Sequence, residues 1–480
     1  NFQITNTAGQ TGTVNVSGSG ILTTTGFFMG DNGGGNSTFN LSGGTVTNSG
    51  QTWITGSNNT INVSGGTFNS TGTFEYGAGV ANGVSSMTVN GTGTINLGSM
   101  TIGRTTSSTT TLNLGTGSAG GNLSISGISW VGGSNTINFN GGTLTTSGAI
   151  TISSANAATV VKSGGAVFNV ASNTLTMSGN LTTDGNGGGL TKNGTGTLVL
   201  SGAGNNYTGT TTVNAGTLEI GGAGLLGGGS YSGNIANTGT FLYNGTNSQT
   251  LSGVISGSGG LTKSNSGNLT LSANNTYTGT TTIFNGGADY SAGNQLRLSN
   301  ASGPAILGNV TIGNNSGTNA GAMLVTTQNN QLGSTSVITI NNTSSGFGYF
   351  ELRGTAQTIA GLSGAASART VVQNQESGTL ASAATLTINN TNNFTYGGII
   401  RDKYFGSVAP LSIIKNGSGT QTFSGNNSYT GMTTINAGTL SLGGSSNRTI
   451  GGSITIAGGE LNYSSVTDNQ IANTANITIS

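Results

Sequence analysis

Apolar and polar residues alternate along the first third of the chain, and the alternation returns at a nearly constant interval. It occurs in the segments TVNVSGSG, TFNLSGGTV, TINVSGGTF, MTVNGTGTI, TLNLGTG and TINFNGGTL. Their first apolar residues are Val14, Phe39, Ile61, Met87, Leu112 and Ile137. A period of two predicts short strands with one buried face. A repeat of about 25 residues predicts that each unit is one coil of a parallel β-solenoid.

The same alternation predicts which side chains face the core. The apolar residues that flank an Asn should point inward and stack from coil to coil: Phe39, Leu41, Ile61, Val63, Leu112, Leu114, Ile137 and Phe139. The intervening residues should form an outward Asn ladder: Asn15, Asn40, Asn62, Asn113 and Asn138. Stacked amides can hydrogen-bond along the axis, which favours a stabilising role for this ladder. A ligand-binding stripe is the alternative.

Composition supports strands and turns over disorder. Gly accounts for 90 of the 480 residues and charged residues for 4%, while Thr, Val and Ile are abundant. β-Branched residues favour strands and Gly favours tight turns. The Gly-Gly pairs after strands, such as Gly43-Gly44, should supply positive φ at coil corners. We therefore expect an all-β chain: a single continuous parallel β-helix, or β-solenoid, over residues 1–480 with about 19 coils.

A longer motif appears three times. Residues 189–221 read GLTKNGTGTLVLSGAGNNYTGTTTVNAGTLEIG, residues 260–287 read GLTKSNSGNLTLSANNTYTGTTTIFNGG, and residues 412–443 read SIIKNGSGTQTFSGNNSYTGMTTINAGTLSLG. These segments resemble the autotransporter-associated β-strand repeat of bacterial autotransporter passenger domains. The middle copy departs from the pattern, because it lacks the final Ala-Gly-Thr-Leu. The resemblance implies a right-handed β-helix that is extracellular or lies on the cell surface of a Gram-negative-type bacterium. It also implies that the repeats aid folding during secretion.

Each copy of the motif pairs a Lys with a later Tyr at an almost constant separation. The pairs are Lys192 and Tyr207, Lys263 and Tyr277, and Lys415 and Tyr429. Recurrence in three copies favours a structural role over a catalytic one. We expect each Lys at a coil corner with its stem along the apolar edge. We expect each Tyr ring to be buried with its hydroxyl at the rim.

The residue inventory argues against enzymatic chemistry. The chain has no His and no Cys, which excludes a Ser-His-Asp triad and His-based metal sites. Ten acidic residues are spread over 480 positions, whereas glycosidic chemistry needs paired acids. We expect no enzymatic activity, no cofactor and no metal. The net charge of +1 with scattered basic residues gives no reason to bind nucleic acid, and no stretch is apolar enough for a membrane-spanning helix.

One constellation of charges stands apart. Glu351, Glu376 and Arg401 follow one another at the interval of the coils, so they should stack as a column that forms a surface contact. The segment around them holds a third of all charged residues: Glu351, Arg353, Arg369, Glu376, Arg401, Asp402 and Lys403. A salt-bridged contact region is the main interpretation. A polysaccharide-cleaving site is the alternative.

These observations favour a non-enzymatic, extracellular structural or adhesive protein, a rigid β-helical rod or filament on the bacterial surface. The alternatives are a polysaccharide-binding or polysaccharide-cleaving β-helix and an ice- or crystal-binding solenoid with flat Thr arrays. Strand alternation reaches both ends of the sequence, in NFQIT and NITIS. We therefore expect end-to-end self-association or continuation in a longer solenoid, together with a possible cell-surface or glycan ligand. So few charges also predict a stability nearly independent of pH between about 4 and 9.

Overall fold

The structure is a computed structural model, and it forms two compact units. It describes residues 1–5, 7–30, 35–77, 79–103, 105–117, 120–284, 294–313, 321–342, 346–375, 382–403, 409–443, 450–463 and 470–480. Unit 1 comprises residues 1–228 and 233–239, and unit 2 comprises residues 229–232 and 240–480.

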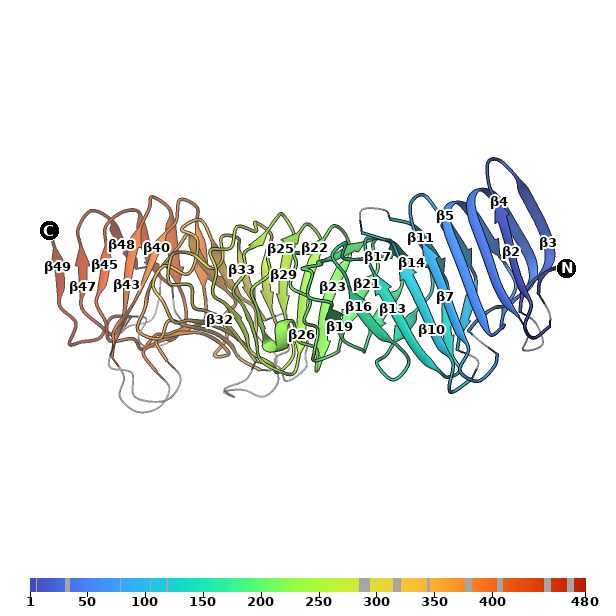
Figure 1. The fold of residues 1–480 in the computed structure, drawn as a ribbon. Helices are drawn as coiled ribbons and strands as arrows, with labels where there is room; N and C mark the ends of the chain where they lie inside the picture. Colours follow the sequence, from blue (N-terminus) through green and yellow to red (C-terminus); the bar gives the residue numbers. More distant parts are fainter. Residues whose placement is uncertain are drawn as a thin grey trace. The chain divides into compact units, whose positions relative to one another are not determined.

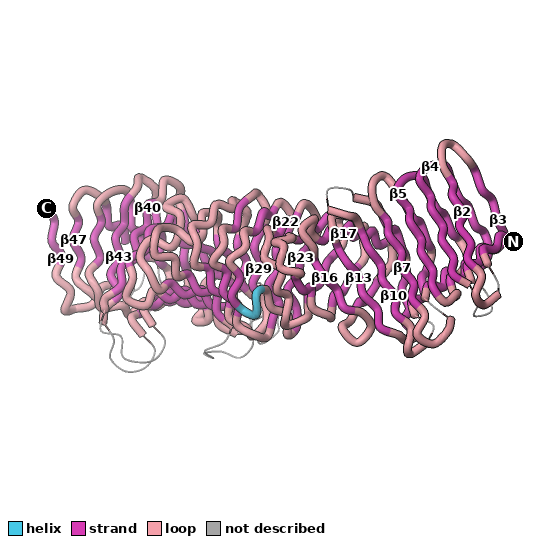
Figure 2. The backbone as a smooth tube through the Cα atoms, in the orientation of Figure 1, coloured by secondary structure: helices cyan, strands magenta, loops and turns pink. Residues whose placement is uncertain are grey.

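Unit 1 consists of parallel strands stacked coil upon coil (Figures 1 and 2). Its strands are β1 (Phe2–Ile4), β2 (Thr11–Val16), β3 (Ile21–Met29), β4 (Asn36–Ile54), β5 (Asn58–Ser70), β6 (Phe74–Tyr76), β7 (Val84–Val89), β8 (Thr94–Leu97), β9 (Ser99–Ile102), β10 (Thr109–Leu114), β11 (Asn122–Ile125), β12 (Gly127–Trp130), β13 (Ser134–Phe139), β14 (Thr143–Thr146), β15 (Ile150–Ile152), β16 (Ala158–Val161), β17 (Ala166–Val170), β18 (Thr174–Met177), β19 (Leu181–Thr183), β20 (Leu190–Asn193), β21 (Thr197–Leu200), β22 (Thr211–Val213), β23 (Thr217–Gly222) and β25 (Ile235–Asn237).

The register of unit 1 follows the predicted repeat. Strands β2, β4, β5, β7, β10 and β13 pair in parallel, and they align Val14, Phe39, Ile61, Met87, Leu112 and Ile137 in one column. The eight apolar residues predicted to face inward are all buried, with at most 4% of any residue exposed. The predicted alternation of faces is therefore confirmed in these coils.

Glycine permits the close approach of successive corners. Gly44 has a φ of 77°, and a Cβ at this position would lie 2.1 Å from the carbonyl oxygen of Gly20 in the preceding coil. Any other residue would both strain the backbone and collide with that carbonyl. The corner can therefore stack on its neighbour only because Gly44 lacks a side chain.

Unit 2 is built in the same way. Its strands are β24 (Ser230–Tyr231), β26 (Thr240–Gly245), β27 (Gln249–Leu251), β28 (Ile255–Ser256), β29 (Gly260–Lys263), β30 (Leu269–Leu271), β31 (Thr281–Ile283), β32 (Gln295–Leu298), β33 (Val310–Ile312), β34 (Ala322–Thr326), β35 (Val337–Ile340), β36 (Gly348–Glu351), β37 (Ala356–Ile359), β38 (Gly361–Gly364), β39 (Thr370–Gln373), β40 (Ala384–Asn389), β41 (Phe394–Tyr396), β42 (Ile399–Arg401), β43 (Leu411–Asn416), β44 (Thr420–Phe423), β45 (Thr433–Ile435), β46 (Thr439–Leu442), β47 (Ile454–Ile456), β48 (Glu460–Tyr463) and β49 (Ile477–Ile479). A short 3-10 turn, η2 (Gly227–Gly229), lies at the division between the units.

The coils of unit 2 differ in length. One buried column aligns Leu296, Leu324, Phe350, Val372 and Ile400, which are unevenly spaced along the sequence. The interval is shortest between Phe350 and Val372. Turns between strands absorb this variation, because loops tolerate changes in length better than paired strands do. The strands therefore stay in register even though the coils are unequal.

The predicted fold class is confirmed: parallel strands stack as a β-solenoid of about 18 turns, with almost no helix. The sequence predicted about 19 coils. Among the described residues, no helix is long and apolar enough to cross a membrane. The continuity of a single solenoid over residues 1–480 stays a prediction.

Candidate functional site

Asn side chains form a hydrogen-bonded ladder along unit 1. Asn40 donates from Nδ2 to Oδ1 of Asn15 at 2.8 Å, and Asn62 donates to Asn40 in the same way at 2.8 Å. All three alternate with more deeply buried apolar residues and so point away from the core. Each amide can donate to one neighbour and accept from the other, which joins successive coils through their side chains.

The ladder changes partner in the next coil. Thr88 stands in register between Asn62 and Asn113, and its hydroxyl accepts from Nδ2 of Asn113 at 3.2 Å. Asn138 then donates to Asn113 at 2.8 Å. The following position in the column is Val160, which has no amide to offer. The five predicted Asn residues thus lie in one column, which Thr88 divides and Val160 ends.

Further Asn pairs occur that the sequence pattern did not single out. They join Asn58 to Asn36, Asn96 to Asn69, Asn214 to Asn193, and Asn436 to Asn416, at distances from 2.7 to 2.9 Å. The last two pairs fall within copies of the longer motif. The sequence signal for these pairs is an Asn that recurs at the same position in consecutive coils.

Replacing Asn40 with Ala should lower the free energy of unfolding by about 1 kcal/mol, because the change removes two side-chain hydrogen bonds at a partly solvated position. The matched control is Asn138→Ala, which removes the one bond to Asn113. Urea denaturation should rank Asn40→Ala as the more destabilising change. Equal effects at the two positions would mean that the second bond of the ladder adds nothing to coil stacking.

The Lys residues of the motif are enclosed by backbone carbonyl groups. Lys192 is fully buried, and its Nζ donates to the carbonyls of Asn193 at 2.9 Å, Gly194 at 2.7 Å and Ala215 at 3.1 Å. Ala215 belongs to the following coil, since β20 pairs with β22 just before it. The ammonium group therefore binds two coils together, and we call this arrangement a lysine cage.

Lys415 repeats the lysine cage in full, and Lys263 repeats the two carbonyl contacts within its own coil. Nζ of Lys415 donates to the carbonyls of Asn416, Gly417 and Ala437 at 2.8, 2.8 and 3.1 Å. Lys263 donates to Ser264 at 2.9 Å and Asn265 at 2.7 Å, and its Nζ lies 5.9 Å from the ring centroid of Tyr243.

Backbone conformation explains why carbonyls converge on each ammonium. The second residue after each Lys has a left-handed conformation: φ is 78° at Gly194, 63° at Asn265 and 74° at Gly417. Gly and Asn are the residues that adopt this conformation most readily. It reverses the chain immediately after the Lys, so that neighbouring carbonyls face Nζ. The Lys-Asn-Gly and Lys-Ser-Asn sequences therefore specify the cage locally.

Burial also governs the ionisation of these groups. It lowers the pKa of Lys192 to about 8 and that of Lys263 to about 7, and it lowers the pKa of Lys415 as well. Desolvation disfavours the charged ammonium, whereas the carbonyl acceptors favour it.

Each motif Tyr is buried over its whole length. Its hydroxyl lies within hydrogen-bond distance of Oγ1 of the Thr four residues later: 2.9 Å for Tyr207 and Thr211, 2.6 Å for Tyr277 and Thr281, and 2.8 Å for Tyr429 and Thr433. Burial raises the pKa of Tyr277 and of Tyr429.

The expected exposure of both motif residues was wrong. The Lys side chains do not reach the solvent, and the Tyr hydroxyls do not lie at a rim, because the coil supplies buried partners to each. Thr at the fourth position after Tyr is the sequence signal for the second partner. The recurring polar residues of the motif therefore connect parts of the fold to one another.

The charged residues of unit 2 form a buried column. Glu351, Gln373 and Arg401 are in register on β36, β39 and β42. Gln373 donates from Nε2 to Oε1 of Glu351 at 2.9 Å, and Arg401 donates from Nε to Oε1 of Gln373 at 2.9 Å. Arg353 donates to Oε2 of Glu351 at 2.8 Å. The amide of Gln373 thus connects a carboxylate to a guanidinium two coils away.

The structure places the predicted column residues unequally. Glu351 and Arg401 share a column, as their spacing suggested, but the coil between Glu351 and Gln373 is shorter than the coil between Gln373 and Arg401. Gln373 therefore stands where the spacing placed Glu376, and Glu376 lies outside the described residues. Glu351 is fully buried and Arg401 is 6% exposed, so neither offers a side chain to an external surface.

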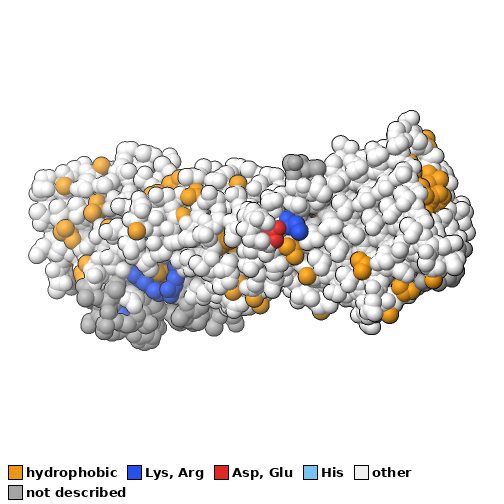
Figure 3. Space-filling model, viewed as in Figure 1, with side chains coloured by type: hydrophobic (Ala, Val, Ile, Leu, Met, Phe, Trp, Pro, Cys, Tyr) orange, Lys and Arg blue, Asp and Glu red, His pale blue; other side chains and the backbone are white. Residues whose placement is uncertain are grey.

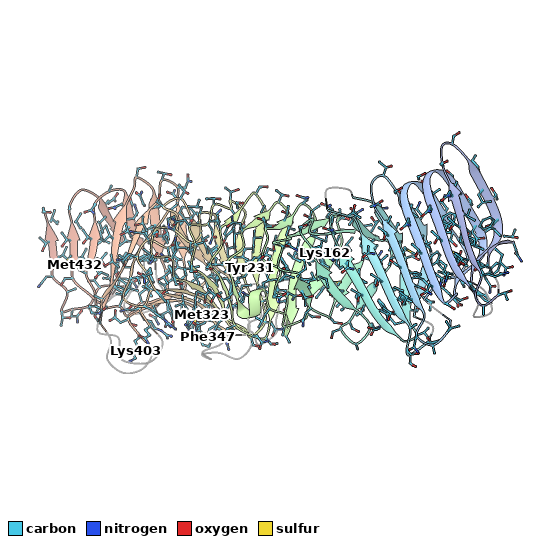
Figure 4. All side chains as sticks on the ribbon, viewed as in Figure 1. Lys162, Tyr231, Met323, Phe347, Lys403 and Met432 are labelled. Atoms are coloured by element: carbon cyan, nitrogen blue, oxygen red, sulfur yellow. The ribbon has the colours of Figure 1, made fainter. Side chains whose placement is uncertain are left out.

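An apolar cluster adjoins the charged column. Met323, Val325, Tyr349 and Val371 are buried together, with Phe347 packed at the edge (Figure 4 labels Met323 and Phe347). The rings of Phe347 and Tyr349 are stacked at 5.4 Å between centroids, and the guanidinium of Arg369 lies 5.3 Å from the Phe347 ring. A single carboxylate held by an arginine and an amide, beside apolar side chains, is suited to structural support. Among the described residues, the contacts of this column involve one carboxylate, whereas glycosidic cleavage requires two.

Comparisons with known proteins identify the motif. A family model described as the passenger-associated-transport-repeat matches residues 190–220, 261–288 and 413–442. The adhesin BmaC autotransporter of Brucella suis biovar 1 (strain 1330) is similar over 188 residues at 32% identity. The similarity covers 31% of this chain and 5% of that protein, so the chain spans a small part of the relative's length. No solved structure matches the chain.

The three matched segments overlap the three copies of the longer motif almost completely, and they contain the motif's Lys residues and the Tyr–Thr pairs. The resemblance to autotransporter passengers is therefore confirmed, and this chain carries the passenger-associated-transport-repeat in three copies.

Proposed function

We propose that this chain is a non-enzymatic, adhesive β-helical part of a surface protein of a Gram-negative-type bacterium. The passenger-associated-transport-repeats support a passenger that is exported to the cell surface. The relative of Brucella suis that is named an adhesin supports attachment as its task.

One observation carries the non-enzymatic part of the proposal. The buried polar groups in the repeats and in the charged column bind other parts of the fold, through the lysine cages and the Glu351–Gln373–Arg401 contacts. Within the described residues, no group of three or more His, Cys, Asp or Glu could hold a metal ion. On the face shown in Figure 3, charged side chains form a few small groups in a largely uncharged surface. Such a surface offers amides, hydroxyls and scattered apolar groups to a partner.

Beads coated with the purified chain should bind host epithelial cells or extracellular matrix at least several-fold more than beads coated with an unrelated β-solenoid of similar size. The physical reason is that many weak polar contacts act together on a multivalent particle. The heat-unfolded chain provides the matched control. Equal attachment of folded and unfolded chain would contradict a role for the folded surface.

An activity assay tests the alternative that the chain cleaves polysaccharides. Incubation with neutral and acidic polysaccharides should release no reducing ends above background. Turnover that Glu351→Gln abolishes while the variant stays folded would overturn the non-enzymatic proposal and make the charged column a catalytic site.

A further inference from the structure

A polar hollow of about 370 Å³ lies in unit 2, where three consecutive coils meet. Its volume is at the lower end of the range for small-molecule sites, about 300–1,000 Å³. Exposed polar side chains and one half-buried aromatic ring line it: Ser334, Thr335, Asn389, Thr391, Asn392 and Phe394. None of its lining residues is charged.

An interruption in the strand ladder accompanies the hollow. Strand β41 is aligned with β38 at Gly364 and Tyr396, but the backbone of Leu362 bonds to the side chain of Gln421 instead. The N–H of Leu362 donates to Oε1 of Gln421 at 3.2 Å, and Nε2 of Gln421 donates to the carbonyl of Leu362 at 2.9 Å.

Gln421 is fully buried and comes from β44, the strand that pairs with β41 in the next coil. Its side chain therefore reaches past the coil of Phe394 to satisfy both polar groups of Leu362. A buried amide that replaces a strand contact lets the coils part without leaving backbone groups unpaired. The hollow is thus a built feature of the fold.

The ring of Phe394 lies against the backbone of Gly361. A Cβ at Gly361 would be 2.4 Å from Cδ2 and Cε2 of that ring, so the absence of a side chain lets the ring lie flat. Phe394 is half-buried in this position. One part of the ring remains open to the hollow as an apolar surface.

Two Asn side chains beside the ring of Phe394 make no hydrogen bond to the described part of the chain. Asn389 is in register with Asn416, which accepts from Asn436 in an amide pair like those of unit 1. Within the described residues, the side chains of Asn389 and Asn392 make no hydrogen bond. Each amide therefore offers two donors and an acceptor next to the aromatic surface.

We propose that this hollow binds a neutral saccharide, with the Phe394 ring under the C–H face of one sugar and the amides of Asn389 and Asn392 bonded to its hydroxyls. A sugar ring presents an apolar face and a polar edge, which match an aromatic ring bordered by uncharged donors and acceptors. The lack of lining charge favours a neutral sugar over a uronic acid. This inference rests on the proposed adhesive function and names the ligand class of one site.

Saturation-transfer NMR and titration calorimetry on the full chain test the inference, with cellotriose, maltotriose and chitotriose as neutral probes and trigalacturonate as the acidic probe. At least one neutral trisaccharide should bind with a Kd on the order of 1 mM. Phe394→Ala should weaken binding at least about tenfold, and Asn389→Ala several-fold. Gly361→Ala should also weaken binding, because the new methyl group displaces the ring.

Tyr463→Ala is the matched control, since this ring is 48% exposed on β48 away from the hollow. It should bind as the unchanged chain does, and circular dichroism should show all variants folded. The inference is overturned if no neutral trisaccharide binds, if trigalacturonate binds more tightly, or if folded Phe394→Ala keeps full affinity. Bead attachment that persists without saccharide binding overturns the inference alone and leaves the proposed function standing. Saccharide binding without bead attachment overturns the proposed adhesive function and leaves the saccharide site standing.

Discussion

Lys192→Met should lower the free energy of unfolding of unit 1 by about 3 kcal/mol. Methionine keeps most of the apolar stem but removes the ammonium, and the three partly buried carbonyls that it bonded lose that donor. Removing a buried charge returns some desolvation energy, yet breaking such a contact from one side generally costs more than it returns.

The matched control for this change is Lys162→Met. Lys162, which Figure 4 labels, lies in the same unit and is half-buried. Its replacement should change the free energy of unfolding by less than about 0.5 kcal/mol in urea titrations. A loss below about 1 kcal/mol for Lys192→Met would show that the lysine cage contributes little to stability.

The pH dependence of the free energy of unfolding gives a second test of the role of Lys192. Lys192 has a pKa of about 8 in the folded chain and an ordinary value of 10.5. Between these values the unfolded chain binds more protons, so the free energy of unfolding should rise with pH from about 8 to 10.5 and stay level below that window. Lys192→Met should flatten this rise. Stability should therefore not stay constant up to about pH 9, as the sequence had predicted. Lys263, whose pKa is about 7, should make the free energy of unfolding rise with pH from about pH 7.

Glu351→Ala should destabilise unit 2 by about 4 kcal/mol. The carboxylate is fully buried and accepts from Arg353 and Gln373, so its removal leaves a guanidinium and an amide without their shared acceptor and opens a cavity. Glu351→Gln should cost less, about 2 kcal/mol, because one acceptor oxygen remains for Gln373 while the charge that faces Arg353 is lost.

Glu460→Ala provides the control, since Glu460 is exposed on β48 of the same unit. It should change stability by less than about 0.5 kcal/mol. Thermal and urea unfolding would place the three variants in order. If Glu351→Ala unfolded at the same urea concentration as Glu460→Ala, the charged column would have no structural role.

The fold was predictable because its determinant is a pattern of residue types. Val14, Phe39, Ile61, Met87, Leu112 and Ile137 were assigned to one column from spacing alone, and the strand register aligns the same six residues. Alternation of period two then fixed their faces, since a shift by one residue would expose the core.

The partners of polar residues were less predictable, for two physical reasons. Coil length varies, so a regular spacing selected Glu376 where the shorter coil places Gln373, and an uncharged residue gave no signal. Composition also does not show which way a carbonyl points. Lys192 looked like a surface residue until the left-handed turn at Gly194 and the following coil's Ala215 were in place. The hollow beside Phe394 depends on Gln421, which is far along the sequence from the backbone of Leu362 that it bonds.

Pairing between successive coils also determines how the molecule would respond to tension. In the described part of unit 1, strands bond to their counterparts in adjacent coils, as β10 bonds to β7 and β13. A pulling force at one end would therefore peel coils away in turn, and each coil would lengthen by roughly 80 Å when straightened. The lysine cage that joins Lys192 to Ala215 would resist this peeling at one point in the series. A particle tethered through such a chain would lose tension in small steps, and each step would dissipate energy while the tether persisted.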